Sequence, residues 1–350
     1  MNKVVRLGCI GAGGFSWGHM LAVQKLDNAE IVAIADIREE QLKEKVDAFG
    51  FKDTYLDYHD LLARDDIDAV LLPLPDQVHC QVACDAMRAG KHVLCEKPMA
   101  LSLDECKEMI RVSDETGKQL MIGQVGRYTP SFVKGMQLVQ AGTIGKIFFI
   151  ESEYAHDYSA IGGTGGWRVT PEREPIIGGG CHAVDLIRMI MGENPTEISA
   201  FANNMSLVDW PIHDCCVGIM KFPSGAIGKV MTSTGCKRKY TMRTCVYGTE
   251  GTLILDNSNP IITIYKEHFS EDSTFGKSMI GVDQQKVAIE IPVSVNSHNL
   301  ADEIKDFCNC LLEGRPVTTP GREGAATVAV CTAVVESFKT GKHVIVDYNF

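Results

Sequence analysis

Long apolar runs, paired cysteine motifs and an excess of basic residues are all missing from this sequence of 350 residues. No apolar run approaches the roughly 18 residues that a membrane-spanning helix requires, so we expect no membrane partner. The 34 lysines and arginines are outnumbered by 45 aspartates and glutamates, and the net charge of −11 argues against nucleic acid as a partner. The segment after Met1 also lacks the apolar region of a signal peptide, and we expect a cytoplasmic protein.

The 13 cysteines form no Cys-x-x-Cys pair. Several of them, such as Cys9, Cys95 and Cys331, lie inside apolar runs, where cysteine behaves as a small hydrophobic residue. We therefore interpret them as reduced thiols and predict no disulfide framework. No spacing of histidine, cysteine, aspartate or glutamate is typical of a metal site, so we predict no metal.

What the sequence does have is the length and the hydrophobic content, 45%, for two domains. Apolar strand patterns alternate with helix patterns over residues 1–123, which predicts an α/β domain with a doubly wound parallel sheet. Over residues 124–350 the strand patterns follow one another in runs, which predicts an α+β domain with a large, mostly antiparallel open sheet. One face of that sheet would carry helices and the other a second copy of the chain, giving a homo-oligomer, either a dimer or a tetramer.

A glycine-rich turn follows the first predicted strand, Val4–Ile10, and leads into a helix predicted to reach Leu26. Glycines in such a turn let the backbone approach a pyrophosphate, which lies at the N-terminus of the helix. The third position of the fingerprint holds serine in place of glycine. The cofactor residues predicted in this turn are Gly11, Gly13, Gly14, Phe15 and Ser16.

Asp36 ends the second predicted strand, where a carboxylate commonly holds the ribose diol of a dinucleotide. Its charge repels a 2′-phosphate and favours NAD over NADP, although Arg38 nearby partly offsets this effect. We therefore assign Asp36, Ile37 and Arg38 to the cofactor site.

A later strand, His92–Cys95, stops at Glu96, Lys97 and Pro98. Ligands of open parallel sheets bind beyond the carboxyl ends of the strands. A half-desolvated lysine at that place, beside a cofactor, can hold or move the proton of a substrate hydroxyl. The alternative is that Glu96 and Lys97 are a solvated pair that ends the strand.

The glycine run 178–180 precedes His182 and Asp185 on another predicted helix. Glycines let the backbone approach a ligand, and residues three apart lie on one helical face. The alternative is a helix in which His182 and Asp185 pair with each other. We expect the following histidines to be surface or capping residues: His19, His59, His268 and His343.

Three segments resemble the Gfo/Idh/MocA oxidoreductases, a family that includes glucose–fructose oxidoreductase and inositol dehydrogenase. They are the glycine turn, the motif Leu-Pro-x-x-x-His at 74–79, and the run Ala-Gly-Lys-His-Val-Leu-Cys-Glu-Lys-Pro at 89–98. The resemblance covers the whole chain and implies a Rossmann domain, an NAD cofactor and a cis bond before Pro98. It implies that these residues surround the nicotinamide half of the cofactor: Leu74, Pro75, His79 and Glu96. Leu74 stands where the family often has threonine, and we add Lys97 and Arg127, the latter just beyond the first domain, to the cofactor residues.

The resemblance also implies catalytic roles. In this family Lys97 would point at the substrate, and the histidine of His-x-x-Asp-Leu, here His182, would act with it as an acid–base pair. The pair Trp167-Arg168, which follows the glycine-rich stretch 162–166, is similar to one that reaches cofactor and substrate in the family, and those glycines predict a mobile active-site loop. The family commonly has an aspartate four residues before the histidine, but this chain has Gly178. The predicted substrate residues are Lys97, Tyr154, His156, Trp167, His182 and Asp185.

The expected activity is NAD-dependent oxidation of a secondary hydroxyl of a sugar, cyclitol or glycoside. Within the family, the stretch 151–158, Trp167-Arg168 and the Gly-Gly-Gly-Cys-His run are most similar to bacterial enzymes that oxidise the C3 hydroxyl of glycosides, including those of the puerarin C-glycoside type. In such enzymes the cofactor can stay tightly bound and be recycled by a second sugar. Two alternatives remain open: an enzyme that uses NAD to cleave glycosides by transient oxidation, and a non-catalytic NAD-binding sensor.

Overall fold

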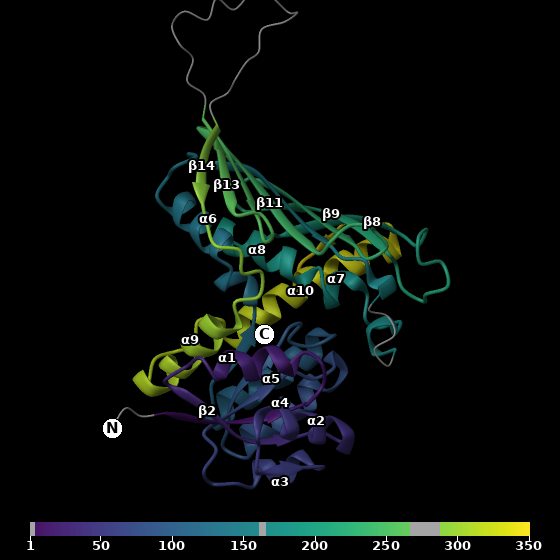
Figure 1. The fold of residues 1–350 in the computed structure, drawn as a ribbon. Coiled ribbons are helices and arrows are strands. Elements are labelled where there is room, and N and C mark those ends of the chain that lie inside the picture. The colour runs from purple at the N-terminus through teal and green to yellow at the C-terminus, as the bar shows by residue number, and fades with distance from the viewer. Residues whose placement is uncertain (1–3, 161–165, 267–287) are drawn as a thin grey trace, which may run out of the picture.

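The structure, a computed structural model, describes residues 4–160, 166–266 and 288–350. Two β-sheets organise it (Figure 1). We call the part around the six-stranded sheet the first body and the part around the nine-stranded sheet the second body. The predicted fold class, a parallel sheet followed by a large and mostly antiparallel one, is confirmed.

Every neighbouring pair of strands in the first body is parallel, in the order β3-β2-β1-β4-β5-β6. The strands are β1 (Val5–Ile10), β2 (Ala29–Ala35), β3 (Thr54–Tyr55), β4 (Ala69–Leu72), β5 (His92–Glu96) and β6 (Leu120–Gly123). The helices are α1 (Ser16–Val23), α2 (Glu39–Phe49), α3 (Tyr58–Leu62), η1 (Asp76–Val78), α4 (His79–Arg88) and α5 (Leu103–Thr116). The strand order reverses between β1 and β4, so ligands are expected beyond the carboxyl ends of these strands.

Capping explains where helices of the first body begin and end. A capping box begins α5, because the hydroxyl of Ser102 accepts the N–H of Glu105 while the carboxylate of Glu105 accepts the N–H of Ser102. The first helix is shorter than predicted. It ends at Val23, and the N–H groups of Lys25 and Leu26 bond to carbonyl groups only three residues back, in a tighter turn than an α-helix makes.

The sheet of the second body has the order β14-β13-β12-β11-β7-β10-β9-β8-β15. Its strands are β7 (Ile147–Ala155), β8 (Glu197–Asn203), β9 (Cys215–Lys221), β10 (Ile227–Ser233), β11 (Thr241–Gly248), β12 (Gly251–Asp256), β13 (Ile261–Tyr265), β14 (Ala288–Pro292) and β15 (Val344–Ile345). β7 and β10 run parallel, and the other neighbours whose pairing is described are antiparallel. β8 ends at Asn203, and beyond it the carboxylate of Asp214 accepts the N–H groups of Ser206 and Leu207 in a turn.

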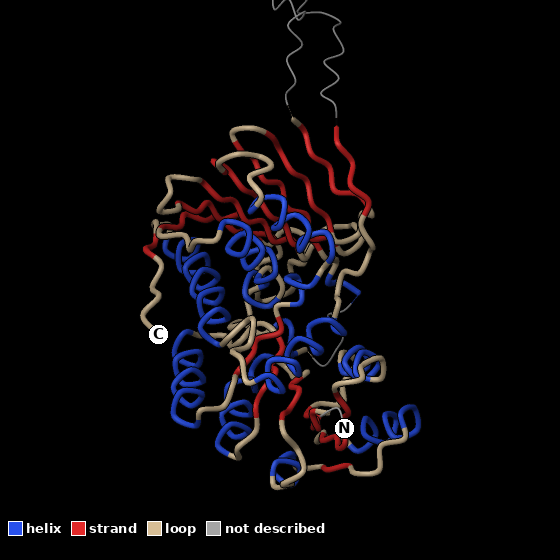
Figure 2. Tube along the Cα trace, turned by 90° about the vertical axis from the view of Figure 1, so that its left-hand side faces the viewer, coloured by secondary structure: helices blue, strands red, loops and turns tan. Residues whose placement is uncertain are grey.

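Helices cover one face of this sheet and lie between it and the first body (Figure 2). The helices that pack on the sheet include α6 (Pro130–Gln140), α7 (Pro175–Gly178), α8 (Cys181–Met191) and α10 (Gly321–Thr340). The other helices after β6 are η2 (Val125–Tyr128), η3 (Tyr158–Ala160), η4 (Trp167–Val169) and α9 (Leu300–Glu313). In the part of the chain that the structure describes, no helix covers the opposite face. The sequence analysis did not predict α7 or β14.

The C-terminal part of the chain returns to the first body. α9 lies beside α1 (Figure 1), so closely that a Cβ at Gly18 would lie 2.8 Å from Cδ1 of Leu300. Leu300, Ile304 and Phe307 share a buried cluster with Leu7 and other residues of the parallel sheet. The division at residues 123 and 124 stays a prediction, but α9 packs with the first body.

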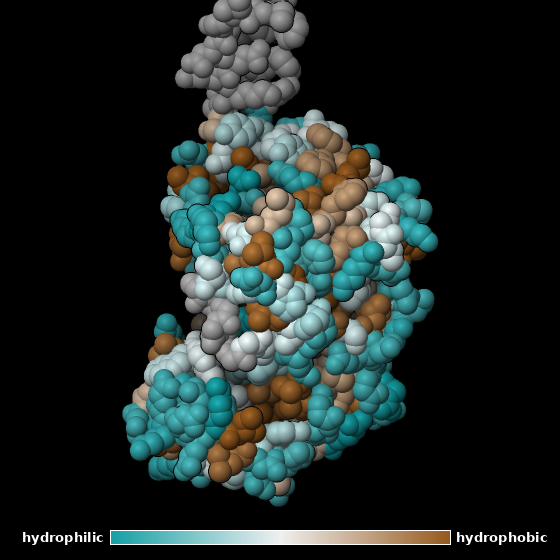
Figure 3. Space-filling model, turned by 90° about the vertical axis from the view of Figure 1, so that its right-hand side faces the viewer, coloured by the Kyte–Doolittle hydropathy of each residue, from teal (hydrophilic) through white to brown (hydrophobic). Residues whose placement is uncertain are grey.

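The surface is polar over most of the side shown in Figure 3, with apolar residues in separate patches. Within the described ranges, no helix combines the length and the apolar character needed to cross a membrane. The cysteines are all free thiols.

Candidate active site

The turn between β1 and α1 requires glycine at position 11. Gly11 has a φ of +106°, in the left-handed region that residues with a Cβ rarely adopt. A Cβ there would also lie 3.0 Å from the carbonyl oxygen of Pro73 and from Cδ2 of Leu74. The turns that follow β1 and β4 are therefore in close contact, and Leu74 packs where the family often has a hydroxyl.

The outer side of the same turn is open. A Cβ at Gly14 would meet no described atom within 4 Å, and at Gly13 the nearest atom is Nη2 of Arg38, at 3.6 Å. The hydroxyl of Ser16 donates to the carbonyl oxygen of Gly13 at 2.6 Å, which closes the turn without a third glycine. Phe15 is exposed next to it. This cradle fits a pyrophosphate at the N-terminus of α1.

Asp36 is fixed at the carboxyl end of β2. One carboxylate oxygen accepts the N–H of Ala12 at 2.8 Å, and the other accepts the N–H and Nε of Arg38 at 2.9 and 3.2 Å. A carboxylate has further lone pairs, so hydroxyl groups of a ribose can still donate to it. Ile37 is 85% exposed beside it and offers an apolar surface. The residues present fit the ribose of a dinucleotide.

His79 supports the cofactor turns from behind. Its ring is buried, with Nδ1 2.9 Å from the carbonyl oxygen of Pro98 and Nε2 3.0 Å from that of Leu74. Both nitrogens are therefore engaged, and the predicted direct contact of His79 with a cofactor is replaced by a link between two turns. The expected cis bond between Lys97 and Pro98 is present.

Glu96 has a buried partner, His19, which was expected to be a surface or capping residue. Nε2 of His19 lies 3.2 Å from a carboxylate oxygen of Glu96, and both side chains are buried. His19 is thus part of the site, not a surface residue as expected. Burial alone would raise the pKa of Glu96, but His19 and Lys97 outweigh it and the pKa is lowered. Glu96 is therefore a buried carboxylate.

Lys97 is half-buried and its charge acts on three histidines. After burial, Lys97 is the main cause that lowers the pKa of His182 well below the ordinary value and that of His298 to about 4. Burial, then Arg168, and more weakly Lys97 lower the pKa of His156. A lysine and histidines from both bodies therefore face one another, and near neutral pH His182 and His298 are uncharged.

The glycine run before His182 admits side chains of the second body. A Cβ at Gly179 would lie 2.6 Å from the ring of Tyr154, and a Cβ at Gly180 would overlap Thr232. A Cβ at Gly178 would overlap the guanidinium of Arg173. The expectation that these glycines bring backbone close to a ligand is therefore corrected, because protein side chains fill the space beside them.

His182, in the first turn of α8, lies among rings. Tyr154 is stacked on it at 6.1 Å between centroids, and His298 lies edge-on at 6.0 Å. Tyr240 continues the cluster, stacked on His298 at 5.3 Å. Nδ1 of His182 is buried and has no hydrogen-bond partner among the described residues. An unsatisfied buried nitrogen of this kind is costly unless a ligand reaches it.

Asp185 and Arg127 form a buried ion pair. Two nitrogens of Arg127 donate to the two carboxylate oxygens of Asp185 at 2.7 and 2.8 Å, and Glu323 accepts from Arg127 at 3.0 Å. Thr327 also donates to Asp185, at 3.2 Å. The pair therefore holds α8 against η2 and α10, while the substrate role of Asp185 and the cofactor role of Arg127 stay predictions. Asp185 does not pair with His182.

Tyr154 lies near the end of β7 and His156 directly follows it, and their role as substrate residues stays a prediction. The hydroxyl of Tyr154 lies 3.1 Å from Nδ1 of His156 and 3.3 Å from the hydroxyl of Tyr158. Arg168 lies over the ring of Trp167 at 4.2 Å, and the carbonyl oxygen of Trp167 accepts Nε2 of Gln77 at 2.8 Å. The predicted mobile loop at 162–166 lies, apart from Gly166, outside the described residues.

Sequence reasoning missed two residues that the C-terminal part brings to the site, His298 and Glu303. Glu303 is fully buried in α9, and neither of its carboxylate oxygens has a hydrogen-bond partner among the described residues. Its pKa is raised well above the ordinary value, first by burial and then by the charge of Glu96. A signal existed, because Glu303 occupies the apolar helical face of Leu300, Ile304 and Phe307.

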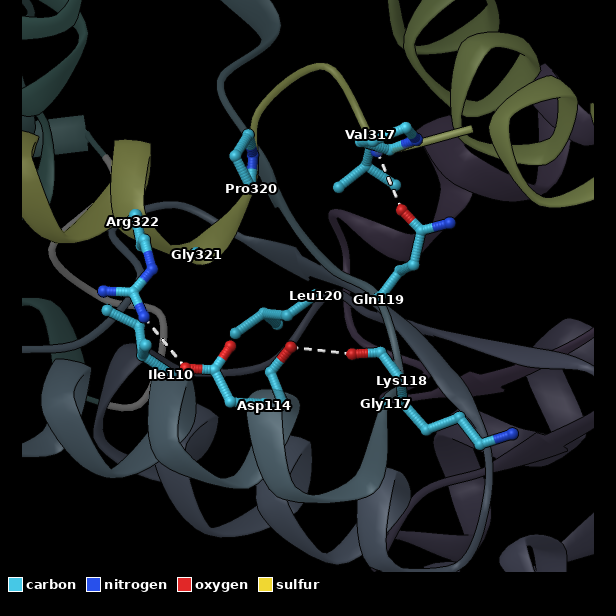
Figure 4. Close-up of a pocket in the computed structure, with 12 residues that line it drawn as sticks. Ile110, Asp114, Gly117, Lys118, Gln119, Leu120, Val317, Pro320, Gly321 and Arg322 are labelled. Carbon is cyan, nitrogen blue, oxygen red and sulfur yellow. Dashed lines mark hydrogen bonds and ion pairs between the residues drawn. The ribbon is translucent and has the colours of Figure 1, made fainter. Parts of the chain in front are cut away.

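A cavity of about 350 Å³ lies elsewhere, between α5, the start of β6 and the segment before α10 (Figure 4). Its polar groups are engaged with one another. Arg322 pairs with Asp114 at 2.8 Å, and Gln119 accepts the N–H of Val317 at 2.8 Å. In the described ranges, no three side chains of histidine, cysteine, aspartate or glutamate gather as a metal would require.

Matches to two family models show which protein family the chain belongs to. Residues 5–124 match "Oxidoreductase family, NAD-binding Rossmann fold", and residues 132–254 match the "GFO/IDH/MocA C-terminal domain". The chain belongs to the Gfo/Idh/MocA oxidoreductase family. Accordingly it is an NAD-binding oxidoreductase of the dehydrogenase type that acts on CH–OH groups.

Curated relatives and solved structures agree with this membership. The chain is 27% identical to myo-inositol 2-dehydrogenase of Thermotoga maritima over 97% of this chain and 98% of that one. It is 32% identical to an uncharacterised oxidoreductase of Bacillus subtilis over 74% of this chain and 76% of that one. The fold is similar to that of a levoglucosan dehydrogenase in complex with NADH and L-sorbose, with a TM-score of 0.87, 21% identity and 99% of each chain covered.

Glu303→Gln should make the protein less sensitive to rising pH. A buried carboxyl with a raised pKa stabilises the fold fully below the pKa of the unfolded chain, and this stability is lost as the pH rises through the folded pKa. The free energy of unfolding of the variant minus that of the wild type should therefore increase as the pH rises above about 4.5. The increase should be at most about 1.4 kcal/mol per pH unit. Urea unfolding at pH 5 to 8 measures this gain. The exposed Glu336→Gln on α10 is the control, and a pH-independent difference for Glu303→Gln would contradict the prediction.

Asp36→Asn should weaken the preference for NAD. The amide keeps an acceptor for the N–H of Ala12 but removes the charge that repels a 2′-phosphate beside Arg38. We expect the KM for NAD to rise about tenfold, as for loss of a charged hydrogen bond, and the ratio of NADP to NAD turnover to rise. Steady-state kinetics with both cofactors measure this ratio. Arg38→Ala should move it the other way, and an unchanged ratio in Asp36→Asn would exclude the role of Asp36.

Proposed function

We propose that the chain oxidises a secondary hydroxyl of a sugar, cyclitol or glycoside, with NAD as cofactor and Lys97 and His182 as the acid–base pair. The observation that carries this proposal is the buried Nδ1 of His182, which has no hydrogen-bond partner in the described part of the chain and lies within the field of Lys97. A protein that only binds NAD needs no such group on its second body. Relatives named for myo-inositol and D-xylose dehydrogenation support the substrate class.

The residues divide the work as follows. Lys97 donates to the substrate hydroxyl and stabilises its oxygen as negative charge develops. His182, neutral because burial and Lys97 lower its pKa, accepts the hydroxyl proton. Glu96, kept ionised by His19 and Lys97, balances the ammonium charge. NAD, held by the turn after β1 and by Asp36, supplies the hydride acceptor when bound.

The rings around His182 suit a sugar. Tyr154, Tyr240, His156 and His298 supply aromatic faces and hydroxyl or imidazole groups, the mixture that sugars require of a pocket. As a finer proposal, the carbon oxidised is C3 of a glucoside, and the product is the 3-keto sugar. The cofactor then stays bound and is recycled by a second sugar.

The uncovered face of the second sheet supports a homo-oligomer. Phe201, Val217 and Met231 stand in register across β8, β9 and β10 on that face, and Phe201 is 84% exposed. The neighbouring Glu153 and Arg243 form an ion pair at 3.3 Å that flanks this apolar row. Separate apolar patches are also visible on the second body in Figure 3. An apolar row with a polar rim suits a second copy of the chain.

Lys97→Met and His182→Asn should each lower kcat/KM by about 100- to 10,000-fold, as expected for loss of a group that moves or stabilises a proton. Binding of NAD should change little, because these side chains face the substrate side. Absorbance of reduced cofactor with a panel of sugars, cyclitols and glycosides measures turnover. NMR of the products replaces it where the cofactor is recycled. The exposed Lys342→Met and His343→Asn are the controls. Full turnover in both site variants, each correctly folded, would contradict the proposal.

Phe201→Glu should shift the protein towards smaller assemblies. A charge in the apolar row is desolvated if a second copy covers it, which weakens association. Light scattering after size-exclusion chromatography measures the mass. Leu56→Glu, which changes an exposed leucine of the first body, should leave the mass unchanged. An equal mass for wild type and Phe201→Glu would argue against this face as the interface.

A further inference from the structure

A buried ion pair joins the two bodies beside the candidate active site. Nε of Arg173 lies 2.5 Å from Oδ2 of Asp76, and both side chains are almost fully buried. Asp76 begins η1 directly after Pro75, on the cofactor side. Arg173 precedes α7 in the second body. Removing one partner of such a pair leaves a buried charge without compensation, so the pair strongly constrains how the two bodies meet.

The guanidinium of Arg173 fills the space beside residue 178. A Cβ at Gly178 would overlap Cζ and both terminal nitrogens of Arg173. Gly178 ends α7, and His182 follows four residues later in the first turn of α8. An aspartate at 178, which the family resemblance leads one to expect, is incompatible with Arg173 in this position.

The same pair holds the wall formed by Trp167 and Arg168. Cζ of Arg173 lies 4.9 Å from the centre of the Trp167 ring, and its Nη1 donates to the carbonyl oxygen of Arg168 at 3.4 Å. Gln77, next to Asp76, donates to the carbonyl oxygen of Trp167 at 2.8 Å and to Thr170 at 3.2 Å. Two adjacent residues of the first body thus fix one wall of the proposed sugar pocket.

We propose that Asp76 and Arg173 are positioning residues that replace an acid at position 178: Asp76 holds Arg173, and Arg173 fixes the Trp167-Arg168 wall and leaves His182 without a carboxylate partner. The inference rests on the proposed function for its catalytic consequence. It accounts for a histidine whose Nδ1 has no partner within the described residues. It also explains why glycine stands at 178.

The test compares Arg173→Ala, Gly178→Asp and the double variant in the full-length protein. We expect Arg173→Ala to lower kcat/KM for the sugar about tenfold or more, with the affinity for NAD within about twofold. Gly178→Asp alone should be at least as impaired, because its side chain overlaps Arg173. The double variant should regain about tenfold over Arg173→Ala, because the new acid enters the vacated space. If Arg173→Ala lowers only the melting temperature, or the double variant is no better than it, the inference is overturned.

A second measurement does not depend on turnover. The pKa of His182, followed by NMR of labelled histidine, should rise by about one unit or more from Arg173→Ala to the double variant, because the inference places the new carboxylate near the ring, where it favours the charged form. An unchanged pKa would overturn the inference even in an inactive protein. If this rise is present but the wild type oxidises none of the sugars, the result would instead count against the proposed function.

Where Arg173→Ala does not fold, Arg173→Lys replaces it. Lysine keeps the positive charge but lacks the planar guanidinium group. The kcat/KM of this variant should therefore be lower than that of the wild type, while its affinity for NAD is retained. Wild-type kcat/KM in that folded variant would likewise overturn the inference.

Discussion

One ammonium group at the end of β5 governs the charge state of the site. Lys97 is half-buried, and it lies next to the ionised carboxylate of Glu96. Three other buried groups near it stay uncharged: burial and Lys97 hold His182 and His298 neutral, while burial and Glu96 keep Glu303 protonated. In a region of low dielectric an unpaired charge of either sign is expensive, so these groups remain neutral around the Glu96–Lys97 pair.

The rest of the fold brings groups to that pair from distant parts of the chain. The parallel sheet places Glu96 and Lys97 next to the glycine turn, because the strand order reverses between β1 and β4. The second body contributes His182 through α8, which the Arg127–Asp185 pair anchors. The return of the C-terminal segment contributes His298 and Glu303. The Arg127–Asp185 pair holds α8 against η2 and α10, and Leu300, Ile304 and Phe307 of α9 pack on the first body. The contacts that position these groups therefore also stabilise the fold.

The features that could be predicted from the sequence are those that depend on neighbouring residues in the chain. Asp36, Glu96 and Lys97 stand at strand ends, and the strand and turn signals around them are contiguous in sequence, so the sheet and its cofactor edge could be inferred. Contacts between distant residues could not. His19 pairs with Glu96, Arg173 with Asp76 and Arg127 with Asp185, and no periodicity relates those positions. The glycine run 178–180 was located, but its purpose was not, because only packing shows that side chains fill the space beside it.

His182, the proposed base, has a lowered pKa, which would make it a poor acceptor of a proton. The electrostatic interaction between His182 and Lys97 accounts for how it could still act. The ammonium charge is one of the causes that lower the pKa of His182. As a hydroxyl held by Lys97 loses its proton, negative charge develops on the oxygen and offsets that ammonium. Two unit charges about 4 Å apart interact by about 4 kcal/mol at an effective dielectric constant of about 20, which corresponds to about three pKa units. In the proposed mechanism His182 therefore becomes more basic as the alkoxide forms and remains neutral before that, so proton transfer would depend on a correctly placed hydroxyl. A substrate that fails to reach Lys97 leaves the histidine a poor base, which makes the position of the hydroxyl itself a source of specificity.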